Sequence, residues 1–225
     1  WGWIDRFGGG RGPGWTPDLT GRRIIRWVHH ATILLQARDK AQSAAFYAAL
    51  SRQASYLGKR WRSAAAGLPR FEALTGLVYA GISLIGMQGL VGPATQALAA
   101  ACEADIDDEG GIPARNPEEL LEVLTLLTWS ASAMSEANLA VPPALSAAIT
   151  RIAPALRVLR HMDGELARFH GGDKGAEGRL DQALAAAGVR TGATPSIAMG
   201  YARLTGGRTS VIVDASAPAG GRAAR

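Results

Sequence analysis

Cysteine and lysine are both scarce in this sequence. Among its 225 residues, Cys102 is the only cysteine, and lysine occurs only at positions 40, 59 and 174. A single cysteine excludes an internal disulfide framework and a cluster of thiolate metal ligands. Because Cys102 follows a run of alanines at 99–101, we interpret it as a buried, inert thiol. Cysteine usage therefore leaves the redox compartment open.

Charged residues are missing altogether between Glu72 and Glu103, a stretch long enough to raise the question of a membrane span. Glycine and proline at positions 86, 89, 92 and 93 divide this stretch into two pieces, each the length of a buried helix. Gln88 and Gln96 would also be costly in hydrocarbon. We therefore expect no transmembrane span.

The charge balance gives a modest net charge of +5, carried mainly by arginine. A basic chain can attract nucleic acid, anionic lipid or an acidic polysaccharide. Solvated helix faces account for the same charge, and we favour that interpretation. Charge alone therefore selects no partner.

The apolar pattern predicts a mainly α protein. Residues 1–17 contain two glycine-rich runs and are predicted to form an irregular arm, whereas residues 18–190 show helical spacing of apolar positions throughout. The clearest helix start is Asn116-Pro117-Glu118-Glu119, with an Asn cap, Pro at the first helical position and acids in the first turn. Helices of ordinary length joined by short loops indicate stacked helical hairpins, as in a repeat solenoid or an incomplete α/α-toroid.

The composition changes at about residue 191. Two short β-like runs, at 201–204 and 209–213, flank Gly206-Gly207 and predict a hairpin. Two strands alone cannot bury a face, so residues 191–225 are predicted to begin an antiparallel β-sandwich that is truncated here. We accordingly interpret the chain as a fragment of a larger protein.

Three short segments carry recognisable motifs. Residues 161–172 read HMDGELARFHGG, residues 200–204 read GYARL, and residues 209–215 read TSVIVDA. They are similar to the H-x-D-G-x-L-x-x-F-x-G-G, G-Y-x-R-L and V-x-V-D-A motifs of the heparinase II/III family of polysaccharide-lyase-like proteins, particularly a group common in proteobacteria. Weaker likeness at 15–26 and 67–81 extends the resemblance over nearly the whole chain.

The resemblance implies an incomplete α/α-toroid followed by an antiparallel β-sandwich, with substrate bound in the cleft between them. It implies β-elimination on an acidic, uronic-acid-containing polysaccharide, without a cofactor or a metal. It favours the periplasm or cell envelope as the location, and the cytoplasm stays open as an alternative. Such a lyase neutralises the uronate carboxylate, removes a ring proton and protonates the leaving oxygen. The family uses an Asn or His, a Tyr and a β-domain His for these tasks.

The sequence departs from that catalytic pattern in three places. Where active members carry an Asn-His pair, residues 67–70 read GLPR; no Tyr follows the Gly110-Gly111 loop up to residue 119; and the β-domain His would lie beyond Arg225. The resemblance therefore implies a fragment that is inactive alone, and the catalytic residues stay unassigned.

Five residues are the candidates for substrate binding: Arg115, Asn116, His161, His170 and Tyr201. The first two could hold a sugar carboxylate or hydroxyl, but a helix cap and its neighbour explain them as well. The two histidines flank a glycine-rich loop, match no standard zinc spacing, and are better explained by a loop that docks a β-domain. For Tyr201 we favour packing at the domain junction over a role as general base.

The leading hypothesis is thus a heparinase II/III-like polysaccharide lyase. The first alternative is a non-catalytic carbohydrate-binding or envelope-associated protein that keeps the fold, and the second is a helical-repeat scaffold for protein partners. We expect no nucleic-acid partner, and the oligomeric state is open.

Overall fold

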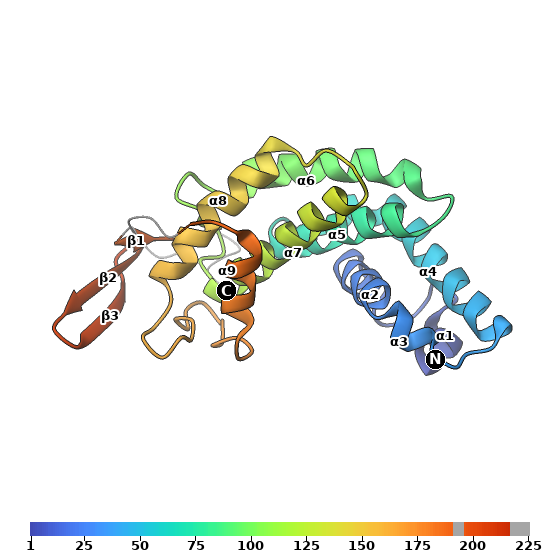
Figure 1. Ribbon diagram of the computed structural model, residues 1–225, viewed down its shortest axis with the longest axis horizontal. Coiled ribbons are helices and arrows are strands. Elements are labelled where there is room, and N and C mark those ends of the chain that lie inside the picture. The colour runs from blue at the N-terminus through green and yellow to red at the C-terminus, as the bar shows by residue number, and fades with distance from the viewer. Residues whose placement is uncertain (191–195, 217–225) are drawn as a thin grey trace. The chain divides into compact units, whose positions relative to one another are not determined.

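The computed structural model describes residues 1–190 and 196–216 of the chain (Figure 1). The α-helices are α1 (Gly2–Phe7), α2 (Pro17–His29), α3 (Ala31–Leu35), α4 (Lys40–Arg60), α5 (Leu68–Ser83), α6 (Val91–Asp105), α7 (Pro117–Glu136), α8 (Pro143–Val158) and α9 (Arg179–Ala187). Short 3-10 helices follow α4 at Trp61–Ser63 and precede α6 at Gln88–Leu90. The strands are β1 (Ile197–Ala198), β2 (Tyr201–Gly206) and β3 (Thr209–Asp214). The prediction of a mainly α chain with antiparallel strands near residue 200 is confirmed.

The chain divides into two compact units. Unit 1 comprises Trp1–Leu98 and Ser132–Ala140, and unit 2 comprises Ala99–Ala131 and Val141–Arg225. The boundaries fall within α6 and α7, so each of these helices contributes residues to both units.

The core of unit 1 is built on the crossing of α2 and α5. Gly21 and Gly76 lie at this crossing, and a Cβ placed on Gly76 would be 2.5 Å from the Cα of Gly21. The two helix backbones therefore touch without an intervening side chain. Arg22 of α2 also forms an ion pair with Glu72, which is 3% exposed. A charged pair and a glycine contact thus fix the same crossing.

The start of α4, in unit 1, is fixed by a side-chain cap. The Asp39 carboxylate accepts a hydrogen bond from the backbone N–H of Gln42 at 2.7 Å, and the Gln42 side chain accepts from the N–H of Asp39. This reciprocal capping box starts α4, as the sequence indicates.

The segment predicted as an irregular arm contains the short helix α1 and packs through its aromatic side chains. The indole rings of Trp3 and Trp15 stack with centroids 5.9 Å apart, and the Arg23 guanidinium lies 3.9 Å from the centre of the Trp3 ring. Trp15 donates a hydrogen bond through Nε1 to the carbonyl of Phe7 at 2.8 Å. These contacts hold the glycine-rich loop against α2.

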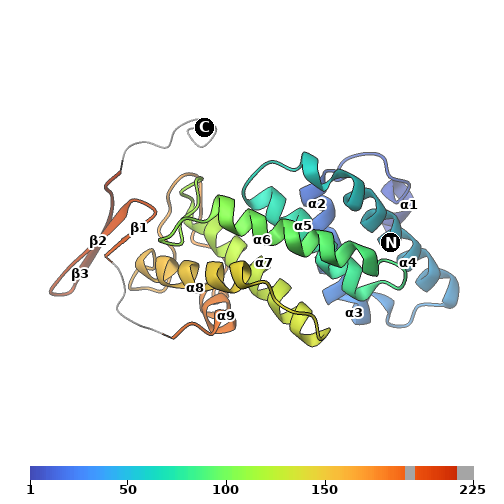
Figure 2. The ribbon, with the colours of Figure 1, turned by 90° about the horizontal axis from the view of Figure 1, so that it is seen from above.

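Unit 2 contains the β-sheet and the helices that position it. The sheet is antiparallel in the order β1-β2-β3, and the β2–β3 register pairs Tyr201 with Asp214 and Gly206 with Thr209. The turn end of the hairpin projects away from α8 and α9 of the same unit (Figures 1 and 2). The predicted hairpin is therefore confirmed, and whether it begins a larger β-domain stays a prediction.

No helix in the described part of the chain has both the length and the apolar character that a membrane crossing requires.

Candidate functional site

Asn116 starts α7 and ties a distant loop to it. Its Oδ1 accepts hydrogen bonds from the backbone N–H groups of Glu118 at 2.9 Å and Glu119 at 3.2 Å. Its Nδ2 donates to the carbonyl of His170 at 3.2 Å, and the Glu118 carboxylate accepts from the N–H of Asp173. Both ends of the Asn116 side chain are thus used within the protein. The residue is 8% exposed.

Arg115, the preceding residue, joins α7 to the sheet. Its Nε donates to the carbonyl of Met199 at 2.9 Å, and its Nη2 donates to the Asp214 carboxylate at 2.5 Å. The guanidinium also lies 4.7 Å from the centre of the Tyr201 ring. The side chain is 11% exposed, so a charge-assisted, largely buried clamp holds the sheet.

Tyr201 completes this clamp from β2. It is fully buried, its hydroxyl donates to the carbonyl of Arg115 at 2.7 Å, and its ring stacks on Phe169 with centroids 4.2 Å apart. Burial raises the pKa of Tyr201 to about 12. The Tyr201 hydroxyl is therefore protonated near neutral pH and donates its hydrogen bond to the backbone. A protonated hydroxyl cannot act as a general base.

The Asp214 carboxylate lies between the side chains of Arg115 and His170. The hydrogen bond from Arg115 lowers the pKa of Asp214 below its usual value, and His170 Nε2 lies 3.8 Å from its other oxygen. Arg115, His170 and Met199 all have positive φ angles, of 52°, 50° and 51°. Such angles are uncommon outside glycine. We call Arg115, His170, Met199, Tyr201 and Asp214 the Arg115 cluster.

A second arginine anchors β2 two residues after Tyr201. Arg203 donates to the carbonyls of Val158 at 3.2 Å and Arg157 at 3.4 Å, and also to that of Arg160. These carbonyls lie at the C-terminal end of α8, where a cation also interacts favourably with the helix dipole. The face of β2 that carries Tyr201 and Arg203 is therefore docked on the helices of unit 2.

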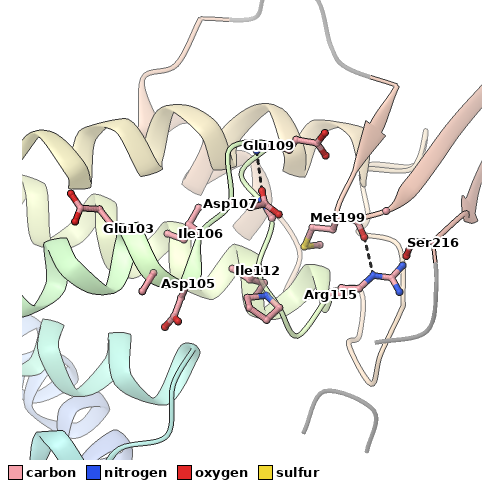
Figure 3. Close-up of a pocket in the computed structure, with 13 residues that line it drawn as sticks. Glu103, Asp105, Ile106, Asp107, Glu109, Ile112, Arg115, Met199 and Ser216 are labelled. Atoms are coloured by element: carbon pink, nitrogen blue, oxygen red, sulfur yellow. Dashed lines mark hydrogen bonds between the residues drawn. The ribbon is translucent and has the colours of Figure 1, made fainter. Parts of the chain in front are cut away.

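A pocket of about 400 Å³ lies beside the Arg115 cluster (Figure 3). Its lining residues are Glu103, Ala104, Asp105, Ile106, Asp107, Glu109, Gly111, Ile112, Pro113, Arg115, Met199, Gly200 and Ser216. Four of these residues are acidic and one is basic. Since Arg115 is already paired with Asp214, the lining carries net negative charge although the chain as a whole is basic.

The acidic wall of the pocket is a rigid turn. Asp107 Oδ1 accepts hydrogen bonds from the N–H groups of Glu109 at 3.0 Å and Gly111 at 2.7 Å. Arg151 of α8 donates through Nε to the Asp107 carbonyl at 3.0 Å. Gly110, with φ of 80°, packs so closely that a Cβ would be 2.2 Å from the Arg151 carbonyl oxygen. No larger residue fits there without moving the turn.

The structure gathers four of the five predicted site residues. Arg115, Asn116, His170 and Tyr201 are joined by the contacts above, whereas no described hydrogen bond, ion pair or ring contact joins His161 to them. The backbone N–H of His161 instead donates to the Glu165 carbonyl at 2.8 Å. Sequence reasoning missed Asp214, Met199 and Arg203 as site residues. Asp214 could have been found from the predicted hairpin, because the strand register places it opposite Tyr201.

Comparison with known proteins finds a relative that is 34% identical over 221 residues, FtsZ-localized protein C of Caulobacter vibrioides (strain NA1000 / CB15N). The name of this relative describes a protein localised with FtsZ. The similarity covers 96% of this chain and 38% of the relative, so the chain spans less than half of that protein's length. No family model matches the chain, and no solved structure matches it.

These findings correct the resemblance to the heparinase II/III family and the polysaccharide-lyase function inferred from it. The relative that matches over almost the whole chain carries no lyase name, and no heparinase model matches. The motif at 161–172 has a local structural explanation, because Gly164 and Gly171 have positive φ angles of 92° and 82°. The backbone conformation of a loop thus explains these glycines, and they are no evidence for lyase activity.

Proposed function

We propose that this chain is a non-catalytic binding module that works with FtsZ. The observation that carries this proposal is the 34% identity over 221 residues to FtsZ-localized protein C. It favours the interaction-protein alternatives over an enzyme acting on polysaccharide. Since the chain matches only 38% of that relative, the proposal concerns one part of the function of such a protein.

The contacts of the predicted site residues support a structural role for them. Arg115 is engaged by Met199, Asp214 and the Tyr201 ring, and the polar ends of Asn116 cap α7 and bind the His170 carbonyl. The Tyr201 hydroxyl is committed to a backbone carbonyl. A substrate would have to displace these bonds, which hold the sheet and the loop at His170 to the start of α7.

The pocket supports a protein partner over an acidic polysaccharide. Glu103, Asp105, Asp107 and Glu109 line it, and they would repel a chain of uronates. The apolar residues Ile106, Ile112, Pro113 and Met199 line the same pocket. A lysine or arginine next to an apolar residue, both belonging to a protein partner, complements this combination.

The test is direct binding of the purified chain to purified FtsZ, combined with co-localisation of a fluorescent fusion with FtsZ in cells. We expect saturable binding that E103K/E109K weakens at least about tenfold, because the variant reverses the charge of the pocket. D5K/E177K is the matched control, since it makes the same charge change at exposed positions outside the pocket. Absence of binding and of co-localisation by the unmodified chain would refute the proposal. Equal weakening by both variants would remove the pocket from it.

We also propose a finer description of the helical part. Successive helices joined by short connections, such as α4 with α5 and α7 with α8, are consistent with stacked helical hairpins of an incomplete α/α-toroid over residues 18–190. An experimental structure of the complete protein tests this arrangement. Helices that fail to stack as successive hairpins around one axis would contradict it.

A further inference from the structure

One face of the β-sheet is apolar and uncovered among the described residues. The register places Ile197, Ala202, Leu204, Val211 and Val213 on the same face, because directly paired residues point the same way and alternate residues point oppositely. Four of these five side chains are between 41% and 61% exposed. The opposite face carries Tyr201 and Arg203, which are docked on the helices.

The outer edge of β3 is also open in the described part of the sheet. The order β1-β2-β3 makes β3 an edge strand, and the N–H of Ala215 donates to the Gly200 carbonyl. Because backbone groups alternate in an antiparallel strand, those of residues 209, 211 and 213 face β2 and those of 210, 212 and 214 face outward. Between Arg208 and Asp214 this edge has no charge and no proline, the usual guards of an edge strand.

The sequence of β3 is complementary to itself when it runs antiparallel. Centred on Val211, an antiparallel copy places Arg208 of each chain beside Asp214 of the other and pairs Thr209 with Val213. Opposite charges therefore meet at both ends of the strand, and β-branched residues pair between them. The outward backbone groups of Ser210 and Ile212 also face one another in this register, as an antiparallel ladder requires.

We propose that β3 pairs with β3 of a second copy of this chain about a two-fold axis at Val211, joining the two three-stranded sheets into one six-stranded antiparallel sheet. A two-fold axis makes the contact isologous and closed, which fits a strand whose charges are arranged head to tail. Asp214, already bonded to Arg115, accepts Arg208 of the second copy at its exposed side. The apolar faces of the two hairpins then become continuous.

The first experiment measures the association state of the 225-residue chain by sedimentation equilibrium. We expect a reversible monomer–dimer equilibrium that weakens as salt is added, since two charge pairs flank the contact. V211K should raise the dissociation constant at least about tenfold, because two lysines would face one another across the axis. L204K is the matched control, since it places a lysine on the same apolar face but one strand away from the edge.

The second experiment tests the register. Cys102 is buried and burial raises the pKa of its thiol to about 12, so an introduced cysteine is the reactive thiol. V211C should form a disulfide-linked dimer under mild oxidation, and I212C should not. A monomer at all concentrations, cross-linking of I212C in place of V211C, or equal loss of association in V211K and L204K would each overturn the proposal. The last result would assign the contact to face-to-face packing, and a monomer would leave the strand to a different partner or to further strands of a longer chain.

Discussion

Arg115 and Tyr201 make two contacts with one another, one through the backbone of Arg115 and one through its side chain. The Tyr201 hydroxyl donates to the backbone carbonyl of Arg115 at 2.7 Å, while the Arg115 guanidinium lies 4.7 Å from the centre of the Tyr201 ring. The two residues are 86 positions apart, and the contact joins the start of α7 to β2. This reciprocal contact is what fixes the sheet to the helices of unit 2, and its loss has measurable consequences.

Removing the Tyr201 hydroxyl should destabilise the protein. The Y201F variant leaves the Arg115 carbonyl without its buried donor, for which we expect a loss of about 1–2 kcal/mol in the free energy of unfolding. Urea denaturation measures it. Y47F is the control, because Tyr47 is 49% exposed and its change should stay within about 0.5 kcal/mol. Equal losses in the two variants would contradict a buried, stabilising hydrogen bond at Tyr201.

The Asp214 carboxylate should make stability depend on pH in the acidic range. Because Arg115 lowers the folded-state pKa of Asp214, its contribution is present above the unfolded-state value of about 3.9 and is lost as pH falls through the lower folded value. The stability difference between the unmodified chain and D214N should therefore be constant near neutral pH and shrink below about pH 4. Urea midpoints measured across this range test it.

The exposed Asp108, on the acidic turn of the same unit, provides the control for that series. D108N should differ from the unmodified chain by the same small amount throughout the range. A D214N difference that grows on acidification would reverse the sign we expect, and would contradict the lowering of the Asp214 pKa by Arg115.

Local sequence signals predicted the helices and strands but not the contacts that join the candidate site residues. The Asn116-Pro117 start of α7 and the hairpin between β2 and β3 each depend on a few neighbouring residues, and both are confirmed, although the turn lies at Gly207-Arg208, one residue later than Gly206-Gly207. The ion pair of Arg115 with Asp214 joins residues 99 positions apart, so no spacing rule contains it.

The sequence also does not predict the positive φ angles of Arg115, His170 and Met199. Each occurs at a residue other than glycine, and tertiary contacts stabilise a backbone conformation that the residue type disfavours. The opposite error occurred at residues 161–172, where glycines required by a turn were taken as a family motif. Glycine patterns reveal backbone geometry, and many unrelated proteins share the same turn.

The hydrogen bond that Asp39 accepts at the start of α4 should make a measurable contribution to the stability of the protein. D39A removes the acceptor for the Gln42 N–H and should lower the free energy of unfolding by about 1 kcal/mol. D39S keeps a capping oxygen and should recover most of that loss. Thermal and urea unfolding of the two variants measure the difference. If D39S were as unstable as D39A, the charge of Asp39 and not its hydrogen bond would be the stabilising feature.

The crossing of α2 and α5 should tolerate no side chain at Gly76. A Cβ there would lie 2.5 Å from the Gly21 Cα and 3.0 Å from the Gly21 carbonyl oxygen, both of them backbone atoms that cannot rotate away. We expect G76A to cost more than about 2 kcal/mol in the free energy of unfolding, since the two helices must separate. Urea denaturation of the variant measures this cost.

G92A is the matched control for that substitution, because Gly92 lies in α6 and a Cβ placed on it would have no neighbouring atom within 4 Å. Alanine there should be neutral or stabilising by up to about 1 kcal/mol through its higher helix propensity. A stable G76A would show that the crossing can open by the width of a methyl group, and that the Arg22–Glu72 ion pair alone suffices to hold α2 on α5.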